Sequence, residues 1–131
     1  MPKTRILIVD DEADFTQTVK FYLEETRGYA VETINHASHT VSFARKFRPD
    51  IIFMDVIMPE MEGPDVVRLL RACEEVRETP VVFLTATVTE EEIAAGRGII
   101  AGHRFLAKAG RIQELVNCID ETLFAVSQKL C

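Results

Sequence analysis

The stretch PDIIFMDVIMPEMEG, Pro49 to Gly63, decides the fold of this chain. Its apolar run Ile51–Met54 is typical of a β-strand that is covered on both faces. The run ends at a carboxylate, Asp55, and turn-forming residues follow. We expect Gly63 to supply backbone freedom before a helix that has Pro64 in its first turn. The stretch therefore predicts a buried strand with an acidic group at its C-terminal end.

The same pattern extends over the whole chain. Short apolar or β-branched runs also occur at Arg5–Val9, Tyr29–Ile34, Val81–Leu84 and Arg104–Leu106. Apolar residues at helical spacing predict helices near residues 15–23, 41–47, 66–73, 93–100 and 112–126. Five strands alternating with five helices predict an α/β fold, a doubly wound parallel sheet with helices on both faces. For five strands we expect the flavodoxin-like order 2-1-3-4-5.

Length and composition limit the classes of function. The 131 residues fit a single domain, which we expect to span residues 1–131. The net charge of −6 argues against direct binding to nucleic acid or to anionic membrane. The chain contains no apolar run long enough to span a bilayer and no signal-peptide pattern, so we expect a cytoplasmic protein. The three histidines, His36, His39 and His103, are not expected to form a metal site.

Polar residues follow four of the five predicted strands. In doubly wound sheets, ligands bind beyond the C-terminal ends of the strands, where the strand order reverses. The residues at these ends are Asp10, Asp11, Asp55, Thr85 and Lys108. Each has an ordinary explanation when taken alone: Asp11, for example, could cap the first helix. Their joint placement at adjacent strand ends predicts a functional site.

The chemistry of such a site is restricted by charge. Two carboxylates about 4 Å apart repel by roughly 4 kcal/mol near a protein surface. They therefore share protons or bind a hard cation. Oxygen ligands without histidine or cysteine favour Mg²⁺, or Mn²⁺, over zinc or copper. A carboxylate beside such an ion and a lysine can attack phosphorus and form an aspartyl phosphate, whose developing charge the two cations neutralise.

Four motifs support a family resemblance. The segments ILIVDDE, PDIIFMDVIMPEMEG, TPVVFLTA and FLAK occur in this order. Together they resemble the receiver domain of two-component response regulators over about residues 5–123. The resemblance implies that Asp55 is the phosphoacceptor. It also implies that Mg²⁺, or Mn²⁺, is held by Asp10, Asp11, Asp55 and the backbone carbonyl of Ile57.

The resemblance also implies a switch and its partners. Thr85 is similar to the hydroxyl that turns toward the phosphoryl group, Lys108 to the lysine that pairs with it, and Phe105 to the aromatic residue that rotates inward. The phosphoryl donor would be a phosphohistidine on a sensor histidine kinase or a histidine phosphotransfer protein. The receiver would act on a downstream protein partner or on an output domain of a longer regulator or hybrid kinase. Its chemistry would be self-phosphotransfer and slow self-dephosphorylation, without enzymatic turnover of another substrate.

The sequence departs from the family pattern at three places. Lys108 is followed by Ala109, where the family usually has a proline after a cis bond. A cis peptide bond before a residue other than proline costs about 2.5–4 kcal/mol. We therefore expect the Lys108–Ala109 bond to be either trans, with a rearranged loop, or cis and strained. Ile57 and Thr87 flank the site, and the apolar Ile57 predicts slow autodephosphorylation because it cannot position water. Glycines 96 and 98 weaken the predicted fourth helix.

Two other functions stay open. Because Lys108 is followed by Ala109 and not by proline, the chain could be a degenerate receiver, a protein-interaction module that works without phosphorylation. Against it stands the complete set of three aspartates, Thr85 and Lys108. The other alternative is a small Mg²⁺-dependent phosphatase or phosphotransferase on another α/β fold. Such an enzyme needs a general acid near the nucleophile and a covering cap, but Asp55 is followed by Val56 and Ile57.

Overall fold

The structure is a computed structural model that describes residues 3–86, 99–100 and 103–130. Within these residues, six strands form one sheet in the order β2-β1-β3-β4-β6-β5. The strands are β1 (Arg5–Val9), β2 (Ala30–Ile34), β3 (Ile51–Asp55), β4 (Val81–Thr85), β5 (Ile99–Ile100) and β6 (His103–Ala107).

The predicted parallel sheet is confirmed, and one strand is added to it. The fifth predicted strand is β6 of the structure. With this strand counted as the fifth, the parallel strands follow the predicted order 2-1-3-4-5, as β2, β1, β3, β4 and β6. β5 is antiparallel to β6 at the edge of the sheet and pairs Ile99 with Arg104. Ile100, which the sequence pattern placed with the fourth helix, therefore lies in a strand. A two-residue strand has no periodicity of its own, so the sequence pattern could not separate it from the helical spacing before it.

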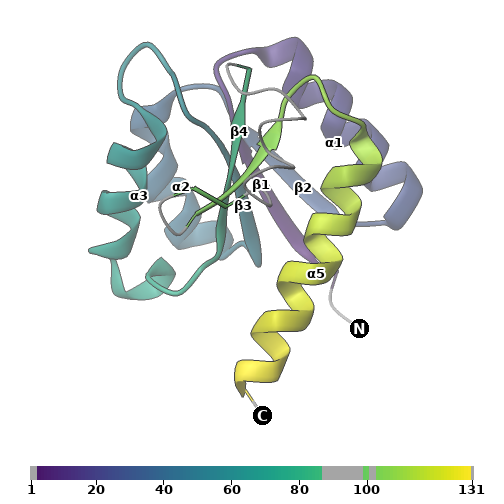
Figure 1. Cartoon of the computed structure of the whole chain (residues 1–131). Coiled ribbons are helices and arrows are strands. Elements are labelled where there is room, and N and C mark those ends of the chain that lie inside the picture. The colour runs from purple at the N-terminus through teal and green to yellow at the C-terminus, as the bar shows by residue number, and fades with distance from the viewer. Residues whose placement is uncertain (1–2, 87–98, 101–102, 131) are drawn as a thin grey trace.

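Helices cover both faces of the sheet. The described α-helices are α1 (Ala13–Arg27), α2 (Thr40–Phe47), α3 (Gly63–Arg71) and α5 (Ile112–Leu130), with short 3₁₀ turns η1 (Ala37–His39) and η2 (Glu74–Val76). In Figure 1, α1 and α5 lie on one side of the sheet and α2 and α3 on the other. These four predicted helices are confirmed. The remaining predicted helix falls mainly within residues 87–98 and lies outside the described residues.

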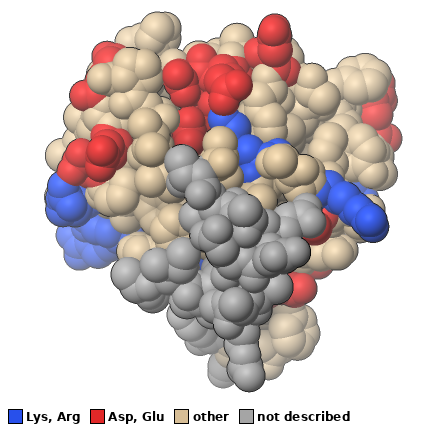
Figure 2. All heavy atoms as spheres, turned by 45° about the horizontal axis from the view of Figure 1, so that its top comes forward, with Lys and Arg blue, Asp and Glu red and all other residues tan. Residues whose placement is uncertain are grey.

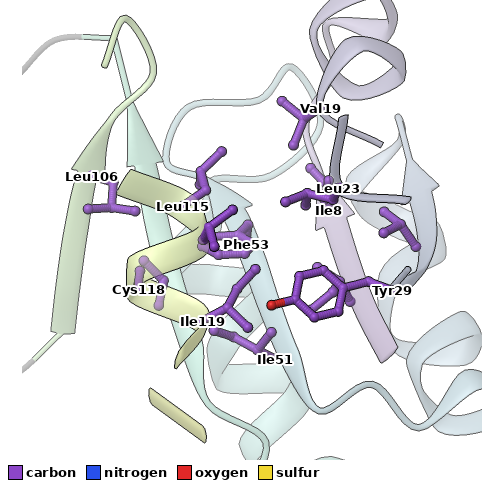
Figure 3. Close-up of a cluster of buried hydrophobic side chains, with 14 of the residues drawn as sticks. Ile8, Val19, Leu23, Tyr29, Ile51, Phe53, Leu106, Leu115, Cys118 and Ile119 are labelled. Atoms are coloured by element: carbon purple, nitrogen blue, oxygen red, sulfur yellow. The ribbon is translucent and has the colours of Figure 1, made fainter. Parts of the chain in front are cut away.

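The core consists of two layers, because neighbouring residues of a strand point to opposite faces. Ile6 and Ile8 of β1 join the cluster under α1 and α5, together with Phe53 (Figure 3). Leu7 and Val9 join the cluster under α2 and α3. These residues are almost completely buried, which explains why the strand is apolar at consecutive positions.

α5 is the longest helix, with 19 residues. Its buried side chains Leu115, Val116 and Ile119 pack against the sheet, whereas Phe124 is exposed. In Figure 1 the helix extends beyond the edge of the sheet toward the C-terminus. None of the helices among the described residues, α5 included, combines the length and the apolar character that a bilayer span requires.

Gly63 has a different role from the predicted one. Among the described glycines, only Gly28 at the end of α1 has a positive φ, 67°, so Gly63 does not need unusual backbone freedom. A Cβ at Gly63 would instead lie 2.5 Å from the backbone oxygen of Asp55 and 3.0 Å from the ring of Phe83. Gly63 therefore allows the start of α3 to approach the end of β3. Pro64 occupies the first turn of α3, as predicted.

Candidate functional site

The three aspartates meet at the C-terminal edge of the sheet. Asp10 directly follows β1, Asp55 ends β3, and the register pairs Val9 with Met54. Carboxylate oxygens of Asp10, Asp11 and Asp55 lie within 4.8 Å of one another. Asp10 is 0% exposed and Asp55 is 6% exposed, whereas Asp11 faces solvent. The structure thus brings together the carboxylates that the sequence pattern placed at adjacent strand ends.

Two residues that the sequence analysis did not select hold Asp10 in place. The backbone N–H of Glu12 donates a hydrogen bond of 2.9 Å to Asp10 Oδ1. The amide of Asn35 donates to the backbone oxygen of Asp10 at 2.8 Å. Asn35 directly follows β2, so the strand-end rule could have found it. Glu12, not Asp11, is the N-cap residue of α1, and its side chain makes no capping hydrogen bond.

Lys108 reaches the acidic cluster from the end of β6, which is separated from β3 by β4. It follows β6, and its backbone N–H donates a hydrogen bond of 3.0 Å to the backbone carbonyl oxygen of Thr85. Its ammonium lies 2.9 Å from Asp10 Oδ2 and 3.9 Å from Asp55 Oδ2, and it also contacts the carboxylate of Glu12. All described peptide bonds are trans, so Ala109 is accommodated without a cis bond and Lys108 still points at the aspartates.

The ammonium of Lys108 is held in its charged form. Burial by itself would lower the pKa of Lys108, because desolvation disfavours the charge. Hydrogen bonds to Glu12 and Asp10 and the charges of Asp10 and Asp55 outweigh this, so the pKa lies above its ordinary value. Nζ also lies 4.9 Å from the centre of the Phe15 ring, a favourable cation–π distance.

Asp55 resists ionisation in this environment. Burial and the charge of Asp10 raise the pKa of Asp55 from 3.8 to about 7. The charge of Lys108 and a backbone hydrogen bond from Ile57 work in the opposite direction, and a hydrogen bond with Asp11 adds to the increase. A cation close to Asp55 would favour its ionised form and lower this pKa.

The residues fit a hard divalent cation. Asp10 Oδ2 is buried, and among the described residues the ammonium of Lys108, at 2.9 Å, is the cation that faces it. The three aspartates supply only oxygen atoms, which is the donor set that Mg²⁺ prefers. A cation among them would offset the repulsion from Asp10 that, after burial, raises the pKa of Asp55.

An open pocket of about 230 Å³ gives access to Asp55. The lining residues are Asp11, Glu12, Asp55, Ile57, Thr85, Ala86 and Lys108. Figure 2, which brings this edge of the sheet toward the viewer, shows acidic side chains gathered beside a smaller basic group. The side chain of Ile57 is 59% exposed. Thr87, the second predicted flanking residue, lies outside the described residues.

The two predicted switch residues lie on neighbouring strands. Thr85 ends β4 and is almost completely buried, and it pairs in register with Ala107 of β6. Phe105 of β6 is half-buried, and the centre of its ring lies 5.0 Å from that of Phe83. Phe105 therefore packs with the cluster under α2 and α3, on the strand that also leads to Lys108.

Comparison with known proteins identifies the class to which this sheet and acidic cluster belong. The family model of the response regulator receiver domain matches residues 6–120. The chain belongs to the family of response regulator receiver domains, which act in two-component systems. The resemblance that the four sequence motifs carry is thereby confirmed.

Relatives and solved structures agree with this assignment. The chain is 34% identical over 111 residues to the probable transcriptional regulatory protein TcrX of Mycobacterium tuberculosis, covering 85% of this chain and 46% of that protein. The chain thus spans less than half the length of this curated relative. A signal receiver domain of a histidine kinase from Syntrophus aciditrophicus is 32% identical, with a TM-score of 0.74 over 94% of this chain and 92% of the other. The chemotaxis protein CheY4 of Vibrio cholerae is 28% identical, with a TM-score of 0.77 over 92% and 99%.

Proposed function

We propose that residues 1–131 form a single receiver domain that accepts a phosphoryl group on Asp55. The observation that carries this proposal is the meeting of three aspartates within 4.8 Å, with the ammonium of Lys108 at 2.9 Å from Asp10 and 3.9 Å from Asp55. The donor is a phosphohistidine on a sensor histidine kinase or a histidine phosphotransfer protein. Membership of the receiver family supports this choice of donor.

The proposed reaction is a transfer between two side chains. A carboxylate oxygen of Asp55 attacks phosphorus, the P–N bond to the donor imidazole breaks, and the imidazole leaves. Asp10, Asp11, Asp55 and the backbone carbonyl of Ile57 are the proposed ligands of Mg²⁺, which supplies positive charge for the phosphoryl oxygens when it is bound. Lys108 supplies a second positive charge beside Asp55. The domain turns over no further substrate, apart from hydrolysis of its own acyl phosphate.

The proposed output is a change of surface. The hydroxyl of Thr85 turns toward the phosphoryl group, and Phe105 moves further inward on the next strand. Two observations support this movement: Phe105 packs against Phe83, and Phe105 is only half-buried. The part of its ring that now faces solvent can become buried. A downstream partner or an output domain then binds one state better than the other, which shifts the equilibrium.

The test is phosphorylation by a small donor. We expect acetyl phosphate with Mg²⁺ to add one phosphoryl group, measured by intact mass. Addition is expected to vanish in Asp55→Asn and in the presence of a chelator. Asp14→Asn, an exposed acid in the first turn of α1, is the matched control and is expected to behave like the parent. Absence of addition in the parent would favour an interaction module that works without phosphorylation, and addition that persists in Asp55→Asn would move the acceptor elsewhere.

A further inference from the structure

A side-chain amide joins three elements beside the aspartate site. Asn35 directly follows β2, and its amide nitrogen donates two hydrogen bonds. One, of 2.8 Å, goes to the backbone oxygen of Asp10, which follows β1. The other, of 3.1 Å, goes to the hydroxyl of Thr16 in the first turn of α1. One side chain thus ties the end of β2 to the end of β1 and to the start of α1.

The bond to Asp10 continues the pairing of β1 with β2 beyond the last strand residues. The register pairs Val9 with Ile34, and the backbone N–H of Asp10 donates to the backbone oxygen of Ile34 at 3.0 Å. In a parallel ladder, the carbonyl of such a residue also accepts a bond from the neighbouring strand. The side chain of Asn35 supplies this bond. Because the backbone of Asp10 is held at both its N–H and its carbonyl, the direction in which its side chain leaves the backbone is fixed.

Thr16 is a polar residue at a fully buried position of α1. It is 0% exposed, and its hydroxyl donates to the backbone oxygen of Ala13 at 3.0 Å while it accepts from Asn35. A buried hydroxyl costs free energy unless it is paired, so packing alone would be served as well by an apolar residue. The hydroxyl of Thr16 therefore supports the amide of Asn35 from the side of α1.

The segment held in this way contains two of the proposed metal ligands. Asp10, Asp11 and Glu12 connect the end of β1 to the start of α1. The backbone N–H of Glu12 donates to Asp10 Oδ1 at 2.9 Å, and the backbone N–H of Thr16 donates to the backbone oxygen of Glu12 at 3.2 Å. Asn35 thus secures the first residue of the segment and Thr16 the last, with the solvent-facing Asp11 between them.

The simplest other explanation is that Asn35 only stabilises the fold. The chemistry of its partners is more restrictive than that explanation requires. A backbone oxygen only accepts hydrogen bonds, so the nitrogen of the amide, and not its oxygen, has to face Asp10. Ionised aspartate at this position would present only acceptors to the carbonyl of Asp10, and an apolar residue would present no polar group. The contact therefore depends on a neutral donor that acts on the backbone of a proposed metal ligand.

We propose that Asn35, supported by Thr16, is a positioning residue that sets the affinity of the aspartate site for Mg²⁺. This proposal rests on the proposed function, in which Asp10 and Asp11 are ligands of the ion. Mg²⁺ requires nearly ideal octahedral geometry, so displacement of a ligand weakens its binding. Hydrogen bonds that orient the ligands of a metal typically contribute a factor of about 10 to 100 to its affinity. Asn35 supplies no ligand atom and acts through the backbone of Asp10.

The test is a calorimetric titration of the full chain with Mg²⁺ alone. We expect Asn35→Ala to weaken Mg²⁺ binding by about tenfold. Asn35→Leu, which fills a similar space without a donor, should lose about as much. Thr16→Val should lose roughly threefold, because it removes one neutral hydrogen bond that supports the amide, and Thr16→Ser should restore most of this loss.

The matched control is Gln17→Ala. Gln17 carries a second side-chain amide that joins α1 to β2, since it donates to the hydroxyl of Thr33 at 3.4 Å at an exposed position. Its removal should leave the affinity for Mg²⁺ unchanged. An equal loss of affinity in Gln17→Ala and Asn35→Ala would mean that any weakening of the α1–β2 contact affects the metal, and would overturn the proposal.

Two further measurements separate positioning from a purely structural role. In Asn35→Ala, the Mg²⁺ concentration that gives half-maximal phosphorylation by acetyl phosphate should rise about tenfold, whereas the rate at saturating Mg²⁺ should stay within about twofold of the parent. Adding Thr16→Val to Asn35→Ala should cause little further loss of affinity, because Thr16 acts through Asn35. Losses that simply add would refute the supporting role of Thr16.

The outcomes distinguish this proposal from the proposed function. If Asn35→Ala lowers the free energy of unfolding in metal-free urea but binds Mg²⁺ like the parent, Asn35 has only a structural role and this proposal alone is overturned. If the parent itself binds no Mg²⁺, the proposed metal site fails and this proposal fails with it.

Discussion

Lys108 pairs with Asp10: its ammonium lies 2.9 Å from Asp10 Oδ2, whereas Asp55 Oδ2 is 3.9 Å away. The lysine is therefore nearer to a proposed metal ligand than to the proposed phosphoacceptor. Glu12 holds the same ammonium from the solvent side. A phosphoryl group on Asp55 would bring new negative charge toward Lys108. It would compete with the carboxylates of Asp10 and Glu12 for the ammonium.

Loss of the lysine charge should slow phosphorylation. We expect Lys108→Met to lower the rate of phosphorylation of Asp55 by about tenfold or more, since a hydrogen bond to a charged group is worth roughly 1.5–3 kcal/mol. The rate is measured by intact mass over time with acetyl phosphate. Lys46→Met, an exposed lysine on α2, is the control. An unchanged rate in Lys108→Met would show that its ammonium does not act on the reacting group.

Loss of Glu12 should have the opposite effect. Glu12→Gln removes a competitor for the Lys108 ammonium, so we expect phosphorylation about twofold to fivefold faster than in the parent, the size of one exposed ion pair. The effect should disappear when Lys108→Met is already present. Asp14→Asn removes a comparable acid from the first turn of α1 and should change nothing. A gain that persists without Lys108 would contradict a contact through the lysine.

The raised pKa of Asp55 predicts a pH-dependent stability in metal-free buffer. Its pKa is raised from 3.8 to about 7, so the folded chain binds this proton more tightly than the unfolded chain. The stabilisation is complete below pH 3.8 and is lost as the pH rises through about 7. A shift of this size corresponds to roughly 4 kcal/mol. Because the pocket is open and solvent screens the charge, we expect the parent to lose about half of this, on the order of 2 kcal/mol, relative to Asp55→Asn, which cannot titrate.

Urea unfolding of both proteins at a series of pH values, with a chelator present, gives this difference directly. Mg²⁺ should reduce the loss at high pH, because the ion stabilises the ionised carboxylates. A stability difference between parent and Asp55→Asn that stays constant with pH would refute the raised pKa.

Gly63 should not tolerate a side chain. A Cβ there would lie 2.5 Å from the backbone oxygen of Asp55, so we expect Gly63→Ala to destabilise the fold by about 1–3 kcal/mol. Gly28→Asn is the comparison, because nothing lies within 4 Å of a Cβ at Gly28 and asparagine accepts its φ of 67°. Urea unfolding measures both. Equal, small effects would mean that the start of α3 can move away from β3 without cost.

Ile57 should set the lifetime of the acyl phosphate. Its exposed side chain borders the pocket and has no group that could hold an attacking water. We therefore expect slow autodephosphorylation in the parent and a severalfold shorter lifetime in Ile57→Asn. Decay of the phosphorylated mass after removal of the donor is the measurement, and Leu69→Asn, on an exposed part of α3, is the control. A parent half-life of only seconds would contradict this explanation.

The sheet and the clustering of the candidate site residues could be predicted because both follow from local sequence. Buried parallel strands need consecutive apolar residues, and their C-terminal ends meet at one edge, so the runs before Asp10, Asp55 and Thr85 located the site. The short strand β5 was missed because two residues carry no periodicity. The prediction for Gly63 was wrong because a close approach between β3 and α3 leaves no local signature in the chain.

Contacts between distant side chains were decided by the tertiary structure alone. The sequence determined the order of strands, the acidic edge and membership of the receiver family, since these depend on apolar spacing and on motifs. Only the folded chain placed Glu12 against Lys108, Asn35 on Asp10 and His36 beside Glu60. Such contacts depend on how loops from different strands approach one another in space, and that approach is set by the packing of both helical layers on the sheet.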